Sequence, residues 1–232
     1  MKFTLVACTL NEIDGMRFVM PQIKREWLDQ IIILDGGSKD GTIEYAKEQG
    51  YTVYVQKRKG IRRAYEEVWP MIEGDVVITF SPDGNCVSSL IPALIEKMKK
   101  GFDMVIVSRY LPPAVSTDDD LLTAFGNKMF TGMINLLHRG HYTDSMGIYR
   151  AYKKELPHKL RLMGEAPYEP MESWLGTVSS WEPLLSIRAA KYGLRCAEIA
   201  GDEPARVGGV RKLQIIKWGL TYMSQTVREF FL

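Results

Sequence analysis

The run ILDGGSKDGT, residues 33–42, is the feature that most constrains how this chain can fold. A short apolar stretch ends at Asp35, a turn of glycine and serine follows, and a helix is expected to begin near Thr42. This succession of strand, glycine-rich turn and helix is typical of open α/β sheets, which bind ligands at the carboxyl ends of their strands. Asp35 could accept hydrogen bonds from a ribose or a base there. The alternative is a tight turn in which Asp40 caps the helix.

The same arrangement recurs in VVITFSPDGN, residues 76–85. An apolar strand leads into Pro82 and Asp83, Gly84 permits close approach, and Asn85 adds a polar group. A carboxylate at such a strand end can bind Mg²⁺ or Mn²⁺, ions that prefer hard oxygen ligands and often bridge phosphate oxygens. The alternative is an ordinary Pro-Asp-Gly turn.

Apolar runs and helical patterns alternate through the first half of the chain. Such alternation predicts an α/β fold with a mostly parallel, doubly wound sheet. The second half is less regular: residues 111–126 hold two prolines and an acidic run and are expected to form a loop that enters a helix, and several prolines lie between 156 and 183. Strands are expected at 3–8, 31–34, 52–55, 76–80, 104–108 and 194–199, and helices at 15–27, 42–49, 61–72, 90–99, 123–137, 182–192 and 213–230.

Composition limits the class of protein. The chain has 232 residues, of which 46% are hydrophobic, which is enough for a single domain over residues 1–232 with a substantial core. The formal net charge of +2 gives no argument for a nucleic-acid partner. Cys8, Cys86 and Cys196 lack CxxC spacing and are expected to be free thiols. No run of 18 apolar residues occurs, so no transmembrane helix is predicted.

Seven segments, taken together and in order, resemble glycosyltransferase family 2, and within it the polyprenyl-phosphate sugar synthases of the dolichyl-phosphate mannose synthase type. The resemblance implies a GT-A (Rossmann-like) fold, a nucleotide-diphosphate-sugar donor, a divalent metal ion (Mg²⁺ or Mn²⁺) and inverting hexosyl transfer. The segments are TLNE (9–12), ILDGGSKDGT (33–42), KGIRRA (59–64), GDVVITFSPDGN (74–85), DMVIVSRY (103–110), TDSMGIYRAY (143–152) and ARVGGVRK (205–212).

The resemblance also assigns donor-binding residues. The nucleoside and diphosphate would be held by Asn11, Glu12, Asp35, Lys59, Arg206 and Lys212. The chain departs from the family pattern twice: Gly36 stands where a second aspartate is usual, and Ser81 stands at the first position of the Asp-x-Asp metal motif. Asp83 keeps the second position, and Asn85 is a further candidate metal ligand.

On the acceptor side, Arg109 matches an arginine that the family places near an acceptor phosphate, and Lys128 is a looser match. Asp144 and Arg150 fit another family motif. Asp144 is the first candidate for general base if the acceptor is a hydroxyl, whereas a phosphate acceptor needs no base. Glu182 is either an acidic site residue or a carboxylate that favours a helix N-terminus.

The favoured function is therefore sugar transfer, catalysed by Asp83, Asp144 and Arg109, to a polyprenyl phosphate at the cytoplasmic membrane face. Two alternatives stay open: a soluble glycosyltransferase acting on a sugar or small-molecule hydroxyl, and a non-catalytic nucleotide-sugar-binding protein. The expected final helix could lie on a membrane surface or pack on the domain. Localisation is expected to be cytoplasmic, and peripheral contact with the membrane face and a homo-oligomer stay open.

Overall fold

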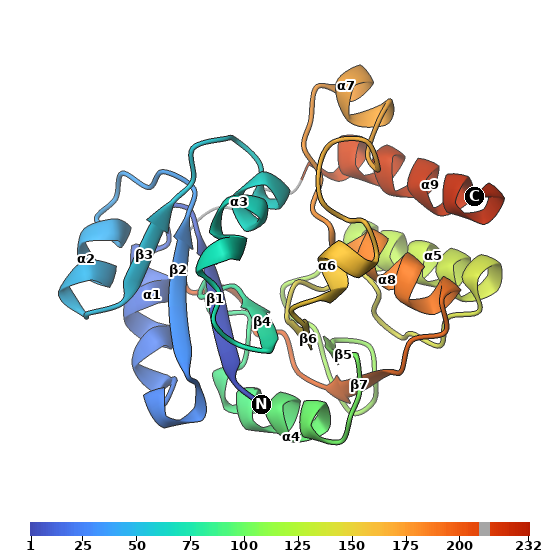
Figure 1. The fold of residues 1–232 in the computed structure, drawn as a ribbon. Coiled ribbons are helices and arrows are strands. Elements are labelled where there is room, and N and C mark those ends of the chain that lie inside the picture. The colour runs from blue at the N-terminus through green and yellow to red at the C-terminus, as the bar shows by residue number, and fades with distance from the viewer. Residues whose placement is uncertain (209–213) are drawn as a thin grey trace.

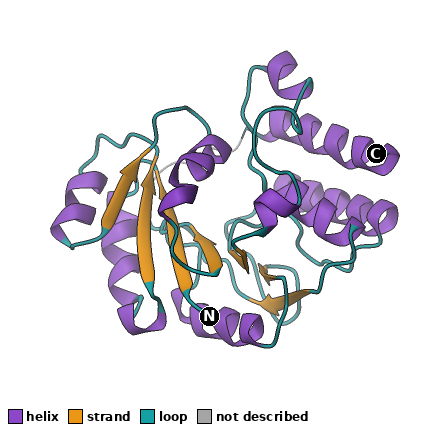
Figure 2. Cartoon of the chain, in the orientation of Figure 1, coloured by secondary structure: helices purple, strands orange, loops and turns teal. Residues whose placement is uncertain are grey.

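The computed structural model describes residues 1–208 and 214–232. Its centre is a sheet of seven strands within the described residues, flanked by helices (Figure 1; Figure 2). The strands follow the order β3-β2-β1-β4-β6-β5-β7 across the sheet. Their bounds are β1 Phe3–Thr9, β2 Gln30–Asp35, β3 Thr52–Val55, β4 Val76–Phe80, β5 Met104–Ser108, β6 Arg150–Lys153 and β7 Cys196–Ala200.

The sheet is mostly parallel, as the alternating pattern predicts. Strand β1 pairs in parallel with both β2 and β4, so that Ala7 lies opposite Ile33 on one side and Phe80 on the other. Strand β6 is antiparallel to β4 and β5, and the sequence pattern did not predict it. Its four residues carry no apolar run, and it begins with the fully buried Arg150. Parallel strands with both faces covered place their carboxyl ends along a single edge.

Helices cover both faces of the sheet. Helices α1, α2 and α4 enclose one hydrophobic cluster, and α3 and α8 enclose the other, with α5 and α9 packed beyond α8 (Figure 1). The helix bounds are α1 Ile13–Val19, α2 Thr42–Glu48, α3 Ile61–Val68, α4 Ile91–Lys99, α5 Leu121–His138, α6 Leu156–Lys159, α7 Met171–Leu175, α8 Glu182–Lys191 and α9 Ile215–Phe231.

Two predicted helices are shorter than expected because each contains a proline. The pattern over 15–27 becomes α1 and two separate 3₁₀ turns, the first with Pro21 at its start, and the pattern over 61–72 becomes α3 and a 3₁₀ turn that contains Pro70. Proline cannot donate the helical hydrogen bond and its ring clashes with the preceding turn. The final helix lies close to its predicted bounds.

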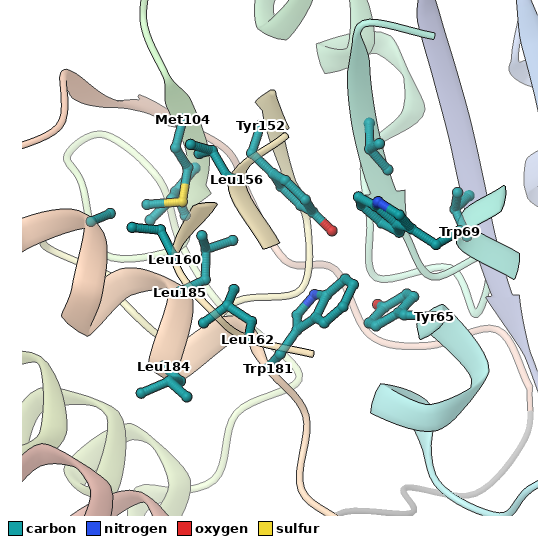
Figure 3. Close-up of a cluster of buried hydrophobic side chains, with 14 of the residues drawn as sticks. Tyr65, Trp69, Met104, Tyr152, Leu156, Leu160, Leu162, Trp181, Leu184 and Leu185 are labelled. Carbon is teal, nitrogen blue, oxygen red and sulfur yellow. The ribbon is translucent and has the colours of Figure 1, made fainter. Parts of the chain in front are cut away.

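An aromatic cluster joins the two halves of the chain (Figure 3). Trp181, just before α8, stacks on Tyr65 of α3 with ring centroids 4.8 Å apart. Trp69 meets the same indole edge-on, with centroids 5.1 Å apart. Such pairs add about 0.5–1.5 kcal/mol each beyond the area they bury. The cluster therefore fixes α8 against α3 beneath one wall of the cavity described below.

The cysteines are free thiols, as expected. Burial raises the pKa of the Cys8 thiol to about 12, so it stays protonated near neutral pH. Within the described residues, no helix combines the length and the apolar character needed to cross a bilayer.

Candidate functional site

A cavity of about 960 Å³ opens at the carboxyl ends of the strands. The residues that follow β1, β4, β5 and β7 line its floor, including Glu12, Asp83, Arg109 and Glu203. Helices α5, α7 and α9 complete its outer walls. The cavity lies at the edge where open α/β sheets hold ligands, and charged groups from distant parts of the sequence meet there.

Asp35 is fully buried in its own turn. Its carboxylate accepts hydrogen bonds from Thr9 Oγ1 at 2.7 Å, from the backbone N–H groups of Gly37 and Ser38 at 2.8 and 2.7 Å, and from Ser38 Oγ at 2.6 Å. The neighbouring Gly36, and not Asp35, lines the cavity. The Asp35 oxygens thus build the turn, and their contact with a nucleoside stays a prediction.

Asp40 orders the turn before α2, but it is not the helix N-cap that the alternative for this turn predicts. Gly41, and not Asp40, is the N-cap residue of α2. The Asp40 carboxylate accepts hydrogen bonds from the Thr42 N–H at 3.0 Å and from the Ile13 N–H at 3.1 Å. Burial would raise the pKa of Asp40, but the hydrogen bond from Thr42 Oγ1, together with these two backbone bonds, lowers it. Asp40 therefore ties the start of α2 to the start of α1 across the two strand ends.

Two residues after β1 fix the adjacent part of the rim. Asn11 is exposed, has a φ of 52°, and accepts a hydrogen bond from the Lys39 N–H through Oδ1 at 2.8 Å. Glu12 is buried, lines the cavity, and donates its backbone N–H to Thr42 Oγ1 at 3.0 Å. The exposed Lys59, before α3, lines the cavity as well. The structure thus brings Glu12 and Lys59 to the cavity and Asn11 beside it.

Asp83 has a different environment from Asp35. Its Oδ1 accepts the Asn85 N–H at 3.2 Å, and its Oδ2 forms an ion pair with Arg206 Nη1 at 3.2 Å. Arg206 Nη2 lies 3.2 Å from Asp118 Oδ2, so one guanidinium links carboxylates from two loops. Asp83 backbone oxygen also accepts the Val207 N–H at 2.8 Å.

Glycine is required beside Asp83. Gly84 has a φ of 101°, and an added Cβ would lie 2.6 Å from the Val207 side chain. A larger residue would push the 201–208 segment away from the strand end. Gly84 thereby permits the close approach that brings Arg206 to Asp83.

Arg109 and Asp144 form a nearly buried ion pair. Arg109 Nε and Nη2 contact the two Asp144 oxygens at 2.6 and 3.1 Å. Arg109 Nη1 also contacts Glu203 at 3.2 Å and Asp119 at 3.6 Å. Asn127 Nδ2 donates to Asp144 Oδ1 at 2.7 Å. The structure therefore joins the two predicted acceptor-side residues directly, as a fork-shaped pair.

The electrostatics of this pair bear on its chemistry. Burial alone would raise the pKa of Asp144, but the charge and hydrogen bonds of Arg109 outweigh burial and lower this pKa from 3.8 to about 2. A base with so low a pKa accepts a proton poorly near neutral pH. Burial raises the pKa of Glu203, which faces the same cavity. Asp144 is thus better placed to orient Arg109 than to remove a proton.

The remaining predicted residues have other positions. Lys128 is exposed on α5 and does not line the cavity, whereas its neighbour Asn127 does. Arg150 is fully buried and donates to backbone oxygens, including that of Gly147. Glu182 lines the cavity and accepts Tyr65 OH at 2.9 Å. Lys212 lies outside the described residues.

Sequence reasoning missed several charged groups at the site. Asp118, Asp119 and Glu203 lie in loops that the sequence marks only as acidic or turn-rich, yet they contact Arg109 or Arg206. The isolated bridge between Ser116 and Glu203 brings these loops together. The acidic run at 118–120, in the loop that follows a strand-end motif, was the available signal for Asp118 and Asp119.

The strand order, the cavity at the strand ends and the carboxylates around it define a GT-A type α/β fold. The sequence profile of Glycosyl transferase family 2 matches residues 4–161, so the chain belongs to this family. This confirms the family resemblance of the seven sequence segments.

Among relatives, the chain is 28% identical over 150 residues to glycosyltransferase AglJ of Haloferax volcanii, an overlap of 63% of this chain and 48% of that protein. It is 32% identical over 119 residues to a dolichol-phosphate mannosyltransferase of Pyrococcus furiosus, an overlap of 48% of this chain and 34% of that protein. The chain thus spans about half or less of the length of these two relatives.

Solved structures share the fold. A mycobacterial protein superposes with a TM-score of 0.74 at 18% identity, over 100% of this chain and 75% of that one. A glucosyl-3-phosphoglycerate synthase from Mycobacterium tuberculosis was solved with Mn²⁺, uridine diphosphate and phosphoglyceric acid. It superposes with a TM-score of 0.65 at 16% identity, over 99% of this chain and 78% of that one. At these identities the likeness establishes the fold alone.

Proposed function

We propose that this chain, acting as one GT-A domain, transfers a sugar with inversion from a nucleotide-diphosphate-sugar to a polyprenyl phosphate. The observation that carries the proposal is the meeting of Asp83, Arg206 and Arg109 around one cavity at the strand ends. Such a cavity can hold a diphosphate beside an acceptor, and family membership supports the transfer reaction.

On the donor side, the residues present fit a divalent ion. Asp83 and Asn85 offer hard carboxylate and amide oxygens on one turn, the donor type that Mg²⁺ and Mn²⁺ prefer. An ion bound there would neutralise charge on the leaving diphosphate. Arg206 and Lys212 would bind diphosphate oxygens, and Asn11, Glu12 and Lys59 would bind the nucleoside. The Mn²⁺ and uridine diphosphate in the mycobacterial synthase are compatible with this division.

On the acceptor side, Arg109 would bind the acceptor phosphate with Asp144 holding the guanidinium in place. The low pKa of Asp144 supports an acceptor that needs no base, because a phosphate oxygen is already ionised near neutral pH. Phe130 of α5 and Trp218 and Tyr222 of α9 also line the cavity. This apolar wall suits the hydrocarbon chain of a polyprenyl acceptor.

The outer surface of α9 supports peripheral contact with the cytoplasmic membrane face. Side chains at helical spacing project from it and remain exposed, which is typical of helices that lie at a bilayer interface. Leu122 and Phe125 of α5 are exposed as well. The exposed side chains of α9 are Ile215, Ile216, Leu220, Met223, Val227, Phe230 and Phe231.

A hydroxyl acceptor is the second candidate, and one observation favours it. Arg109 is already paired with Asp144 and Glu203, so it has less charge to offer a phosphate than a free arginine would have. The two candidates differ in what they require. A phosphate acceptor depends on Arg109, whereas a hydroxyl acceptor depends on a carboxylate base.

A two-stage experiment tests the proposal. First, melting temperatures are measured with UDP-, GDP-, dTDP- and CDP-sugars, with and without Mn²⁺, because a ligand that binds the folded state raises its stability. The stabilising donor is then incubated with a short polyprenyl phosphate, the matching polyprenyl alcohol and simple sugars, and products are identified by mass spectrometry. We expect one class of nucleotide-sugar to raise the melting temperature in the presence of Mn²⁺. Of the acceptors, only the polyprenyl phosphate should be glycosylated. Binding without any product would instead indicate a nucleotide-sugar-binding protein.

A further inference from the structure

Asp118 lies at the donor site although the metal motif does not include it. It belongs to the loop between β5 and α5, and its carboxylate lines the cavity. Its Oδ2 is 3.2 Å from Arg206 Nη2, and the Nη1 atom of the same guanidinium is 3.2 Å from Asp83 Oδ2. Asn85 Nδ2 lies 3.5 Å from Asp118 Oδ2. Asp118 therefore shares the Arg206 guanidinium with Asp83, the predicted metal ligand, and contacts Asn85, the other candidate ligand.

Ser81, the metal-motif position that lacks a carboxylate, lines the same cavity as Asp118. Ser81 follows β4 directly and lines the cavity with Asp83, Asn85 and Asp118. A serine at this position leaves one carboxylate on the β4 turn. One carboxylate binds a divalent ion weakly, since affinity for such ions rises with the number of charged oxygen ligands.

We propose that Asp118 supplies the second carboxylate of the divalent-ion and diphosphate site, in place of the one missing at Ser81, and that the Arg206 guanidinium occupies this cation position until metal and donor bind. The proposal rests on the proposed nucleotide-sugar donor. The guanidinium between two carboxylates is the observation that points to a cation there. When a metal–diphosphate enters, Arg206 exchanges its carboxylate partners for phosphate oxygens, with which it can form paired hydrogen bonds.

A site with two carboxylates needs further oxygen ligands to hold a divalent ion. Across residues 1–208 and 214–232, no group of three or more His, Cys, Asp and Glu side chains is placed to hold a metal ion. Two carboxylates, the Asn85 amide oxygen, phosphate oxygens and water form a suitable shell for Mn²⁺ or Mg²⁺. Metal binding should consequently depend strongly on the nucleoside diphosphate.

The test measures binding of Mn²⁺ by electron paramagnetic resonance, alone and with UDP or GDP, so that it does not depend on turnover. Asp118→Asn should weaken Mn²⁺ binding in the presence of the nucleotide by about 10-fold or more, the scale on which loss of a metal-site partner acts. Asp75→Asn is the matched control. It removes an exposed charge at the opposite edge of the sheet but keeps an oxygen for the Lys2 N–H, and should change binding by less than about twofold because that charge is distant and screened.

Two further variants separate metal binding from mere positioning of Arg206. Adding Ser81→Asp to the Asp118→Asn variant should restore Mn²⁺ affinity, which a purely structural role for Asp118 does not predict. Arg206→Gln should bind free Mn²⁺ more tightly but nucleotide less tightly, because the competing cation is gone. Wild-type affinity in Asp118→Asn, or no rescue by Ser81→Asp, would overturn the role of Asp118 alone. Absence of nucleotide and Mn²⁺ binding in the wild-type protein would overturn the proposed donor as well.

Discussion

The turns after β2 and β4 have similar sequences but different chemistry. Each places an aspartate and glycine after an apolar strand. Asp35 receives four hydrogen bonds from its own turn and from Thr9, whereas the Asp83 side chain receives the Asn85 N–H and the Arg206 guanidinium. The first carboxylate stabilises a turn that positions backbone at the cavity. The second is held by a cation that a ligand can replace.

The largest expected effect concerns Asp83. Asp83→Asn should lower turnover by about 10²–10³-fold or more, because it weakens binding of the divalent ion that would neutralise the leaving diphosphate. The melting temperature should stay close to that of the wild-type protein, since the amide can keep the Asn85 contact. Turnover is measured from sugar transfer at saturating donor, and melting by circular dichroism. Full activity in this variant would remove Asp83 from the mechanism.

Asp35 should show the opposite profile. Asp35→Ala is expected to lower the free energy of unfolding by about 2–3 kcal/mol, since buried donors of the turn lose their acceptor. Urea denaturation measures this effect. Asp35→Asn, which keeps one acceptor oxygen, should lower the free energy of unfolding by less than Asp35→Ala does. If Asp35→Ala is as stable as the wild-type protein but loses nucleotide affinity, then Asp35 contacts the ligand after all.

The Arg109–Asp144 pair predicts a pH-dependent contribution to stability. The lowered pKa of Asp144 corresponds to about 2 kcal/mol of stabilisation. Because the folded-state pKa lies below the unfolded value, this stabilisation is present at neutral pH and is lost as the pH falls from about 5 towards 2. The stability gap between wild type and Asp144→Asn should narrow over that range. Asp75→Asn, which changes an exposed carboxylate, is the control. If the difference in unfolding free energy between wild type and Asp144→Asn stays constant from about pH 5 to pH 2, the stabilisation does not come from the lowered pKa of Asp144.

Asp40 should give the smallest effect. Its carboxylate is exposed and bonds the N–H groups of Thr42 and Ile13. Asp40→Ala should therefore cost about 1 kcal/mol in the free energy of unfolding, the scale of a lost helix-terminal acceptor. Nucleotide affinity measured by isothermal titration should not change. If Asp40→Ala loses more free energy of nucleotide binding than free energy of unfolding, then the nucleotide contacts this turn as well.

The fold was predictable because alternation of buried strands and amphipathic helices is a local pattern. Five strands of the first half lie at or within one or two residues of their predicted bounds. Strand β6 was not predictable, because its RAYK sequence pairs only through contacts with β4 and β5. The proline-limited helices were predictable in principle, since Pro21 and Pro70 are visible in the sequence.

The site was predictable only in part. The strand-end motifs correctly indicated Asp83 and Arg109 as cavity residues. They could not distinguish Asp35 from Asp83, because the number of donors around a carboxylate depends on how the turn closes. Nor could they indicate Asp118 and Glu203, whose loops reach the site through tertiary contacts with Arg206 and Arg109.

Isothermal titration of the preferred nucleoside diphosphate, with and without Mn²⁺, tests the difference between the two turns most directly. The proteins to compare are wild type, Asp83→Asn and Asp35→Asn. We expect Asp83→Asn to lose the Mn²⁺-dependent gain in affinity and Asp35→Asn to keep it. Loss of that gain in Asp35→Asn, with Asp83→Asn binding as wild type does, would contradict the assignment of the β4 turn as the donor site.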